Sequence, residues 1–267
     1  MGVLLEEDRG AIRVLTLNRP QCRNALNTEL LRRLEEGFAT AESDDGVDVI
    51  VLTGADPAFC GGVDLRELEE RGCPPEMGAP LAGVTKPVIG AVNGPAITGG
   101  LELALMCDLL IASELAVFGD THGRLGLLPG WGQIARLPNA VGNRRATELL
   151  LTSRTCDATE ALEFGLVNAV VPHPDTLRKA LAVAAAIGES DQPAVRAILA
   201  QLREGASDQM AAVLARERER AELWQGQGFD TDLVSRKRDS LRGGEADCSI
   251  VALVSARPKT ATWFRSP

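Results

Sequence analysis

The chain has 267 residues, of which 45% are hydrophobic, and we expect one main core with appendages. Its formal net charge of -9 and pI near 4.9 argue against a general nucleic-acid or membrane-surface binder, because such proteins meet phosphates with clustered Lys and Arg. The six cysteines form no C-x-x-C pair, and the sequence contains neither a basic, apolar leader nor an uncharged apolar run of about 18 residues. We therefore expect a cytoplasmic protein with no zinc site, disulfide framework or membrane span.

Short apolar runs alternate with helical patterns through the first two thirds of the chain. A helix is predicted over 27–44, with Leu30, Leu34 and Phe38 on one face, and another over 158–165 that ends at Gly165. Runs closed by Gly, Asn or Pro predict buried strands. These strands cover 11–17, 47–54, 87–94, 108–113 and 165–171. The alternation predicts an α/β fold.

The strand signal ends near residue 174, and helical patterns follow. They cover 174–187, 192–204, 207–225 and 230–242. We therefore divide the chain into an α/β core (1–173), a helical C-terminal region (174–242) and an atypical tail (243–267), which is either mobile or pairs with another chain. The helical region carries apolar side chains that exceed what one core can cover, which predicts self-association. They include Leu199, Leu202, Met210, Val213 and Leu214.

Two glycine turns are the strongest local motifs. The sequence has no phosphate-binding P-loop, dinucleotide fingerprint, zincin motif or hydrolase elbow. Instead, 57–68 ("PAFCGGVDLREL") and 93–108 ("NGPAITGGLELALMCD") each place a Gly-Gly turn between a strand end and a helix start. Such turns leave backbone N–H groups unpaired, and two facing turns would form an oxyanion hole. The alternative is that the glycines only permit tight turns and close packing.

Five stretches together resemble a known family. In chain order they are "LNRPQCRNALN", "VIVLTGADPAFCGGVDL", "TKPVIGAVNGPAITGGLELALMCDLLIAS", "FGDTHGRLGLLPGWG" and "ATEALEFGLVNAVV". They resemble the enoyl-CoA hydratase/isomerase (crotonase) superfamily over roughly residues 5–240. The resemblance implies a spiral core of ββα units and a helical C-terminal trimerisation region, often with trimers paired into hexamers. It also implies binding of an acyl-CoA or enoyl-CoA thioester, with coenzyme A as part of the substrate, and no separate cofactor or metal.

The resemblance assigns residues to the thioester site. The N–H groups of Val63 and Gly99 would form the oxyanion hole. The CoA moiety would lie along Gly61, Val63 and Leu65 and the loop containing Arg23, Asn24 and Ala25. A phosphate contact by Arg23 is one interpretation, and a solvated loop arginine is the other. Leu127 and Trp131, in the apolar stretch 125–131, would line the acyl pocket.

Glu102 and His122 are the candidate acid/base residues. Hydratases of this family hold a water molecule between two glutamates, and Glu102 occupies the first of these positions. The second falls on His122 in "FGDTH", so a histidine replaces the second glutamate. An imidazole can transfer a proton near neutral pH, and we therefore predict an enoyl-CoA hydratase that uses Glu102 and His122. Asp120 is a further candidate acid of the site, but we interpret it as a cap of the following loop.

Other functions are compatible with these motifs. An enoyl-CoA isomerase needs one acid/base group, normally at the position of His122. A non-catalytic acyl-CoA-binding protein would keep the oxyanion hole and lack the paired carboxylates, with His122 as a pocket wall. A hydrolase or a dehalogenase is also open, because the fold hosts many reactions.

Overall fold

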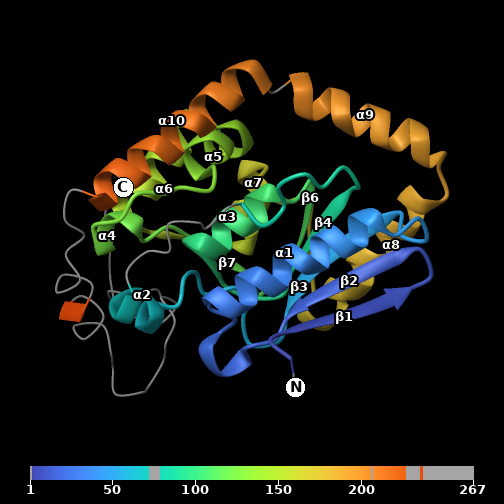
Figure 1. The fold of residues 1–267 in the computed structure, drawn as a ribbon, viewed down its shortest axis with the longest axis horizontal. Coiled ribbons are helices and arrows are strands. Elements are labelled where there is room, and N and C mark those ends of the chain that lie inside the picture. Colours follow the sequence, from blue (N-terminus) through green and yellow to red (C-terminus); the bar gives the residue numbers. More distant parts are fainter. Residues whose placement is uncertain (1, 72–78, 206, 227–234, 237–267) are drawn as a thin grey trace, which may run out of the picture.

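The core of the molecule is a six-stranded sheet in the computed structural model, which describes residues 2–71, 79–205, 207–226 and 235–236 (Figure 1). The strand order is β1-β2-β3-β4-β6-β9. β1 pairs antiparallel with β2, and the other neighbours are parallel. The strands are β1 (Leu4–Arg9), β2 (Ile12–Leu17), β3 (Val49–Gly54), β4 (Val88–Val92), β6 (Leu109–Ser113) and β9 (Ala169–Val171).

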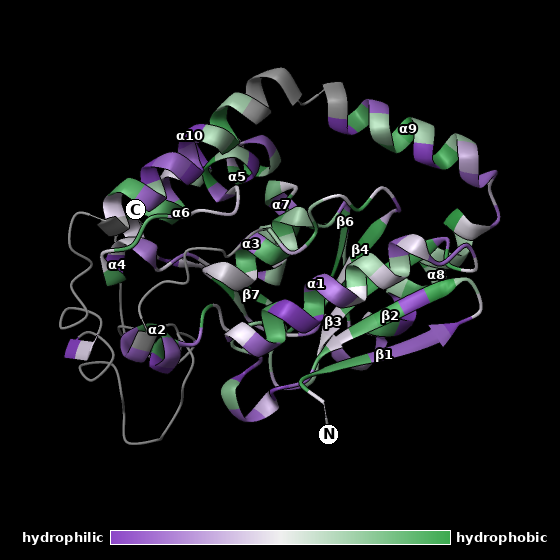
Figure 2. Cartoon of the chain, in the orientation of Figure 1, coloured by the Kyte–Doolittle hydropathy of each residue, from purple (hydrophilic) through white to green (hydrophobic). Residues whose placement is uncertain are grey.

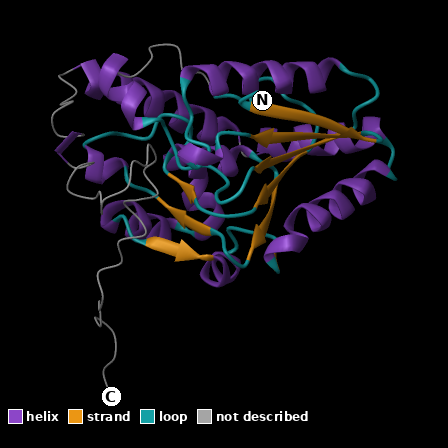
Figure 3. Cartoon of the chain, turned by 90° about the horizontal axis from the view of Figure 1, so that it is seen from below, coloured by secondary structure: helices purple, strands orange, loops and turns teal. Residues whose placement is uncertain are grey.

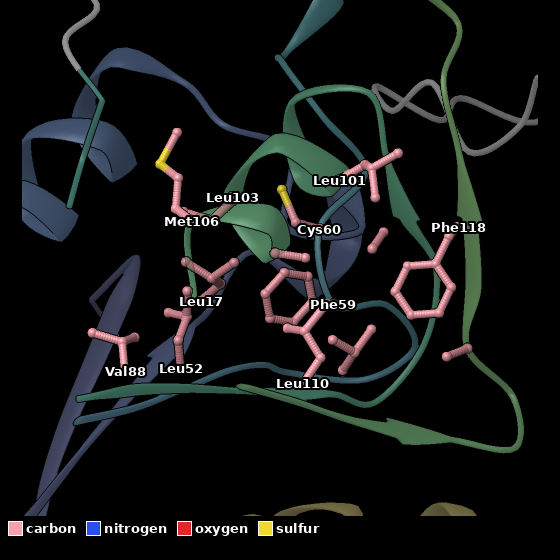
Figure 4. Packing of buried hydrophobic residues seen from close by; sticks show 14 of the residues in the cluster. Leu17, Leu52, Phe59, Cys60, Val88, Leu101, Leu103, Met106, Leu110 and Phe118 are labelled. Carbon is pink, nitrogen blue, oxygen red and sulfur yellow. The ribbon is translucent and has the colours of Figure 1, made fainter. Parts of the chain in front are cut away.

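Helices cover both faces of this sheet (Figure 3). Successive side chains of a strand point to opposite faces, and β3 uses both. Ile50 and Leu52 pack in a cluster with apolar side chains of α1 (Thr28–Ser43) and α3 (Gly99–Met106), whereas Val49 and Val51 pack in a cluster with α8 (Thr176–Gly188). Figure 4 shows the first cluster, with Phe59 near its middle. Burial on both faces explains why β3 is a continuous apolar run.

A second, three-stranded sheet lies beside the first and positions the candidate site. β5 (Ala96–Ile97) pairs parallel with β7 (Val117–Gly119), which pairs antiparallel with β8 (Thr155–Asp157). These strands have only two or three residues, and the sequence patterns predicted none of them.

The remaining helices lie around the second sheet and beyond it. In Figure 1, α10 (Ser207–Gly226) lies along α5 (Gln133–Val141), and α9 (Gln192–Gly205) runs between α8 and α10. Arg203 holds α9 to the start of β6 by an ion pair with Asp108 at 2.8 Å. The other helical segments are α2 (Leu65–Arg71), α4 (His122–Leu125), α6 (Asn143–Thr152), α7 (Ala158–Phe164) and the 3-10 turns Pro20–Cys22 and His173–Asp175.

The expected mixed α/β fold is confirmed, with three corrections. The strand predicted over 165–171 is only Ala169–Val171, because Gly165 is left-handed at the end of α7. α8, assigned to the C-terminal region, covers one face of the core sheet. No sequence pattern predicted α5 and α6. The predicted helix over 230–242 lies largely outside the described residues, and the tail 243–267 lies entirely outside them.

Free thiols are carried by Cys60, Cys107 and Cys156. Cys22 is disulfide-bonded, and the irregular spacing of the cysteines did not predict this bond. Within the described ranges, no group of three or more His, Cys, Asp or Glu side chains is arranged to hold a metal ion. No helix in the described part of the chain is long and apolar enough to cross a membrane.

Candidate active site

Strand pairing brings three distant segments together. A parallel bridge joins Cys60 to Ala96, so the first glycine turn lies beside the start of the second. The parallel pairing of β5 with β7 places Ile97 opposite Gly119. The chain leaves β5 and β7 at the same end, and the turn at 98–100 therefore lies beside the segment at 120–122.

The two predicted oxyanion donors lie next to each other. A Cβ atom placed on Gly99 would be 3.6 Å from the backbone nitrogen of Val63. Among the described residues, neither N–H group donates a backbone hydrogen bond. A Cβ atom on Gly100 would meet the Cys60 carbonyl oxygen at 2.1 Å, so only glycine allows the turns to approach this closely. The two turns thus lie against each other, and an oxyanion hole formed by these two N–H groups stays a prediction.

Thr98 connects the second turn to the His122 segment. Its backbone is left-handed (φ 56°, ψ −112°), a conformation that a β-branched residue rarely adopts. The Thr98 N–H donates to the Gly119 carbonyl at 2.8 Å, and the Thr98 hydroxyl accepts from the Thr121 N–H at 3.1 Å. The two threonine hydroxyls lie 2.7 Å apart. The sequence patterns predicted a role for neither Thr98 nor Thr121. The threonine directly before the Gly-Gly turn was a visible signal for the first of them.

Glu102 is a buried carboxyl group on the first turn of α3, with 4% of its surface exposed. Its Oε1 accepts hydrogen bonds from the N–H of Trp131 at 2.8 Å and of Gly130 at 3.2 Å. Burial raises the pKa of Glu102 to about 7, although the positive charge of His122 and the Trp131 N–H act in the opposite direction. Glu102 therefore exchanges a proton near neutral pH.

His122 begins α4 and lies between two carboxyl groups. Its Nε2 is 3.8 Å from Oε2 of Glu102, and its Nδ1 is 2.6 Å from Oδ1 of Asp120. Burial lowers the pKa of His122, but the charge and hydrogen bond of Asp120 outweigh it, and the net pKa is raised. Burial likewise raises the pKa of Asp120, but the charge and hydrogen bond of His122 outweigh it, and the net pKa is lowered. Asp120 is thus a partner of His122, which the interpretation as a loop cap did not predict.

Glu217 of α10 supports the segment that holds Glu102. Its carboxylate accepts hydrogen bonds from the N–H groups of Gly132 at 3.1 Å and of Ile134 and Ala135 at 3.3 Å. These N–H groups at the start of α5 have no acceptor within the helix itself, and negative charge is favourable at this end of a helix. Sequence reasoning missed Glu217, because it lies 85 residues from Gly132 in the chain.

The predicted CoA-binding residues lie in and around the first glycine turn. Arg23 and Asn24 are both left-handed (φ 49° and 57°). The buried Asn24 side chain donates to the carbonyls of Ala55 and Ala58, each at 2.7 Å, which fixes this loop. The Gly61 N–H donates to the Arg23 carbonyl at 2.8 Å, which joins the loop to the glycine turn. The side chains of Ala25 and Leu65 are also buried. Contact of this group with CoA stays a prediction.

Leu127 and Trp131, predicted to line the acyl pocket, are each 9% exposed. The Leu127 N–H donates to the His122 carbonyl at 2.9 Å, and the Trp131 N–H to Glu102, so both lie close to the acid/base pair. A cavity of about 1000 Å³ lies elsewhere, lined by apolar residues that include those of α8 and α9, and neither Glu102 nor His122 borders it. The acyl pocket stays a prediction.

The fold and this arrangement define a class: an α/β protein with two adjacent glycine turns and buried titratable groups beside short strands. The chain matches the family model described as enoyl-CoA hydratase/isomerase over residues 7–227. The chain therefore belongs to the enoyl-CoA hydratase/isomerase family.

Individual relatives agree with this assignment. The chain is 36% identical over 228 residues to a probable peroxisomal enoyl-CoA hydratase of Arabidopsis thaliana, a match that covers 83% of this chain and 86% of the relative. It is 40% identical over 201 residues to a probable enoyl-CoA hydratase of Mycobacterium bovis, covering 73% and 78%. A solved enoyl-CoA hydratase structure from Mycobacterium avium is 49% identical and has a TM-score of 0.80, covering 85% of this chain and 99% of that one.

Proposed function

We propose that the protein is an enoyl-CoA hydratase-like enzyme that adds water to the 2,3 double bond of an enoyl-CoA thioester. The observation that carries the proposal is the buried pair of Glu102 and His122, with Nε2 and Oε2 3.8 Å apart, near the adjacent N–H groups of Val63 and Gly99. The names of the relatives support the same reaction.

A water molecule about 2.8 Å from each of Glu102 Oε2 and His122 Nε2 would lie beside the line that joins them. In its ionised form Glu102 accepts one proton of this water, and the water oxygen bonds to the β-carbon. The electron pair of the double bond moves toward the thioester carbonyl, and protonated His122 delivers a proton from Nε2 to the α-carbon. Transfer of the proton from Glu102 to His122 restores the starting state, so one water is added overall.

The developing negative charge on the thioester oxygen needs donors that are already in place. In this proposal the N–H groups of Val63 and Gly99 supply them, and such donors each contribute roughly 3 kcal/mol to other acyl-transfer enzymes. No bond in the sequence of steps requires a metal or redox cofactor, and CoA enters as part of the substrate.

The deciding experiment is a crotonyl-CoA hydration assay, followed by loss of the enoyl-thioester absorbance. Glu102→Gln and His122→Ala should each lower turnover by roughly 10²- to 10⁴-fold, because each removes one proton-transfer group. Glu163→Gln, at an exposed position on α7, is the matched control and should keep parent activity. Activity that survives His122→Ala but not Glu102→Gln would contradict the two-residue mechanism and leave His122 as a pocket wall.

A second comparison separates catalysis from binding. Calorimetry with butyryl-CoA and a longer acyl-CoA should show binding by the parent protein. If the parent binds but is inert, and His122→Glu gains hydration, the protein is a non-catalytic acyl-CoA-binding member of the family. Movement of the double bond of a 3-enoyl-CoA without hydration would identify an isomerase. Absence of binding at any chain length would overturn the thioester function itself.

We also propose a homotrimer or hexamer. The exposed apolar side chains Ile198 (59% exposed) and Leu202 (68% exposed) on α9 support it. Val213 and Leu214 are partly buried, and the side chain of Met210 lies outside the described residues. A cytoplasmic location stays a prediction.

A further inference from the structure

The hydrogen bond between Asp120 and His122 is a contact of the site that the proposed mechanism does not use. Oδ1 of Asp120 and Nδ1 of His122 are 2.6 Å apart, and the two side chains expose 3% and 9% of their surfaces. An ionised carboxylate only accepts hydrogen bonds, so the hydrogen of this bond belongs to Nδ1 of the imidazole. Nε2 is then the ring nitrogen left to face Glu102, at 3.8 Å.

We propose that Asp120 is the positioning residue of His122: it fixes the ring with Nδ1 protonated and Nε2 directed at Glu102 and the reacting atoms. This inference rests on the proposed function for its kinetic consequences, but the state of the ring can be measured without any reaction. With Nδ1 occupied, neutral His122 presents a lone pair at Nε2, and protonated His122 presents an N–H there. Either form therefore acts through the same atom.

Asp120 also supplies a negative charge that favours the protonated form of His122. The titratable groups around His122 are Asp120 after β7, Glu102 on α3 and Glu217 on α10, and all three favour the imidazolium. Asp120 is the one in direct hydrogen-bond contact. A lone ionised carboxylate this deeply buried is costly, and the imidazolium offsets that cost. A purely structural loop cap would not require a histidine partner.

The test exploits the fact that the chain has only two histidines. The second, His173, pairs with the more exposed Asp56 through Nε2 at 3.2 Å, which provides a matched control. The parent, Asp120→Asn, Asp120→Ala and Asp56→Asn proteins are labelled on the histidine rings, and NMR spectra over a pH series report the titration and tautomer of each ring. Crotonyl-CoA kinetics on the same samples report kcat and KM.

Asp120→Asn loses the charge, and its amide can either accept from Nδ1–H or donate to Nδ1, so His122 should titrate at lower pH with a weaker tautomer preference. Asp120→Ala should also lose the tautomer preference. We expect kcat to fall by about 10-fold or more for Asn and by roughly 10²-fold for Ala, with KM nearly unchanged. Asp56→Asn removes a carboxylate next to the other histidine and should leave both the His122 ring signals and kcat at the parent values.

Unchanged titration and tautomer of His122 in both Asp120 variants would overturn the proposal. So would parent-like kcat in an active protein whose His122 ring has demonstrably lost its fixed tautomer. If the parent shows no hydration, the proposed function fails, and the NMR result alone then decides whether Asp120 orients the ring.

Discussion

Glu102 is the residue whose ionisation should set the pH dependence of turnover. Its pKa is raised to about 7, mainly by burial, so the basic form is the minor one at lower pH. Burial lowers the pKa of His122, but the charge and hydrogen bond of Asp120 outweigh that effect and raise the pKa above its ordinary value. We therefore expect kcat for hydration to increase as the pH rises through about 7 and to decrease only when His122 deprotonates. A pH series on the parent and on Glu102→Gln checks this, because the variant should lose the lower inflection. An inflection near the ordinary pKa of a glutamate would contradict it.

Thr98 is the residue that should link the oxyanion turn to the acid/base segment. Thr98→Val keeps the β-branched shape, so the backbone strain is unchanged, but it leaves the buried Thr121 N–H without its acceptor. We expect a loss of about 1–3 kcal/mol in the free energy of unfolding, together with a lower kcat. Denaturant titration and the hydration assay measure the two effects.

Thr53→Val is the control for that prediction. Thr53 is also buried, and its hydroxyl donates to the Ala91 carbonyl at 2.8 Å, away from the candidate site. It should lose comparable stability and retain kcat. Equal kcat values for the two variants would show that the Thr98 hydroxyl matters only for folding.

At the scale of elements, the strands predicted from sequence are those buried on both faces. β3 and β4 are continuous apolar runs because α1 and α3 cover one side of the sheet and α8 covers the other. β1 was missed, since its sequence "LLEEDR" is an acidic edge strand with mostly exposed side chains. β5 and β7 are too short for any periodicity, and α5 contains Pro138, which argues against a helix in sequence.

The candidate site was predictable only in part, because some of its contacts join segments that are far apart in the sequence. Glu102 and His122 occur in recognisable motifs. Thr98 and Glu217 acquire their partners only after β5 and β7 pair and α10 packs on α5, and no local pattern encodes those contacts. Asp120 lies only two residues from His122, so the spacing of the two side chains was a local signal for their contact.

The contact of α10 with α5 should contribute to stability and to the geometry of the site. Glu217→Ala removes the acceptor for three N–H groups at the start of α5, so we expect a loss of about 1–2 kcal/mol in the free energy of unfolding. Turnover should also fall, because the adjacent Trp131 N–H holds Glu102. Denaturant titration compares this variant with Glu219→Ala, an exposed position on the same helix that should be neutral. Equal stability of the two variants would contradict the capping role.

For the whole molecule, the exposed apolar residues of α9 make self-association the main expectation. α9 runs between α8 and α10, and hydrophobic and hydrophilic residues alternate along it (Figures 1 and 2). Ile198 and Leu202 lie one helical turn apart with more than half of each side chain exposed, an arrangement that a monomer would leave in water. Light scattering should return three or six times the chain mass of 28.3 kDa.

Leu202→Glu tests whether α9 itself lies in the subunit interface. A charge at this position should shift the population toward smaller species, because burying an unpaired carboxylate between subunits is unfavourable. Gln201→Glu adds the same charge at the neighbouring exposed position and should have a smaller effect, since it points away from the apolar side of the helix. A parent protein that stays at 28.3 kDa over a range of concentrations would refute the oligomer. A parent oligomer unaffected by Leu202→Glu would place the interface on another surface.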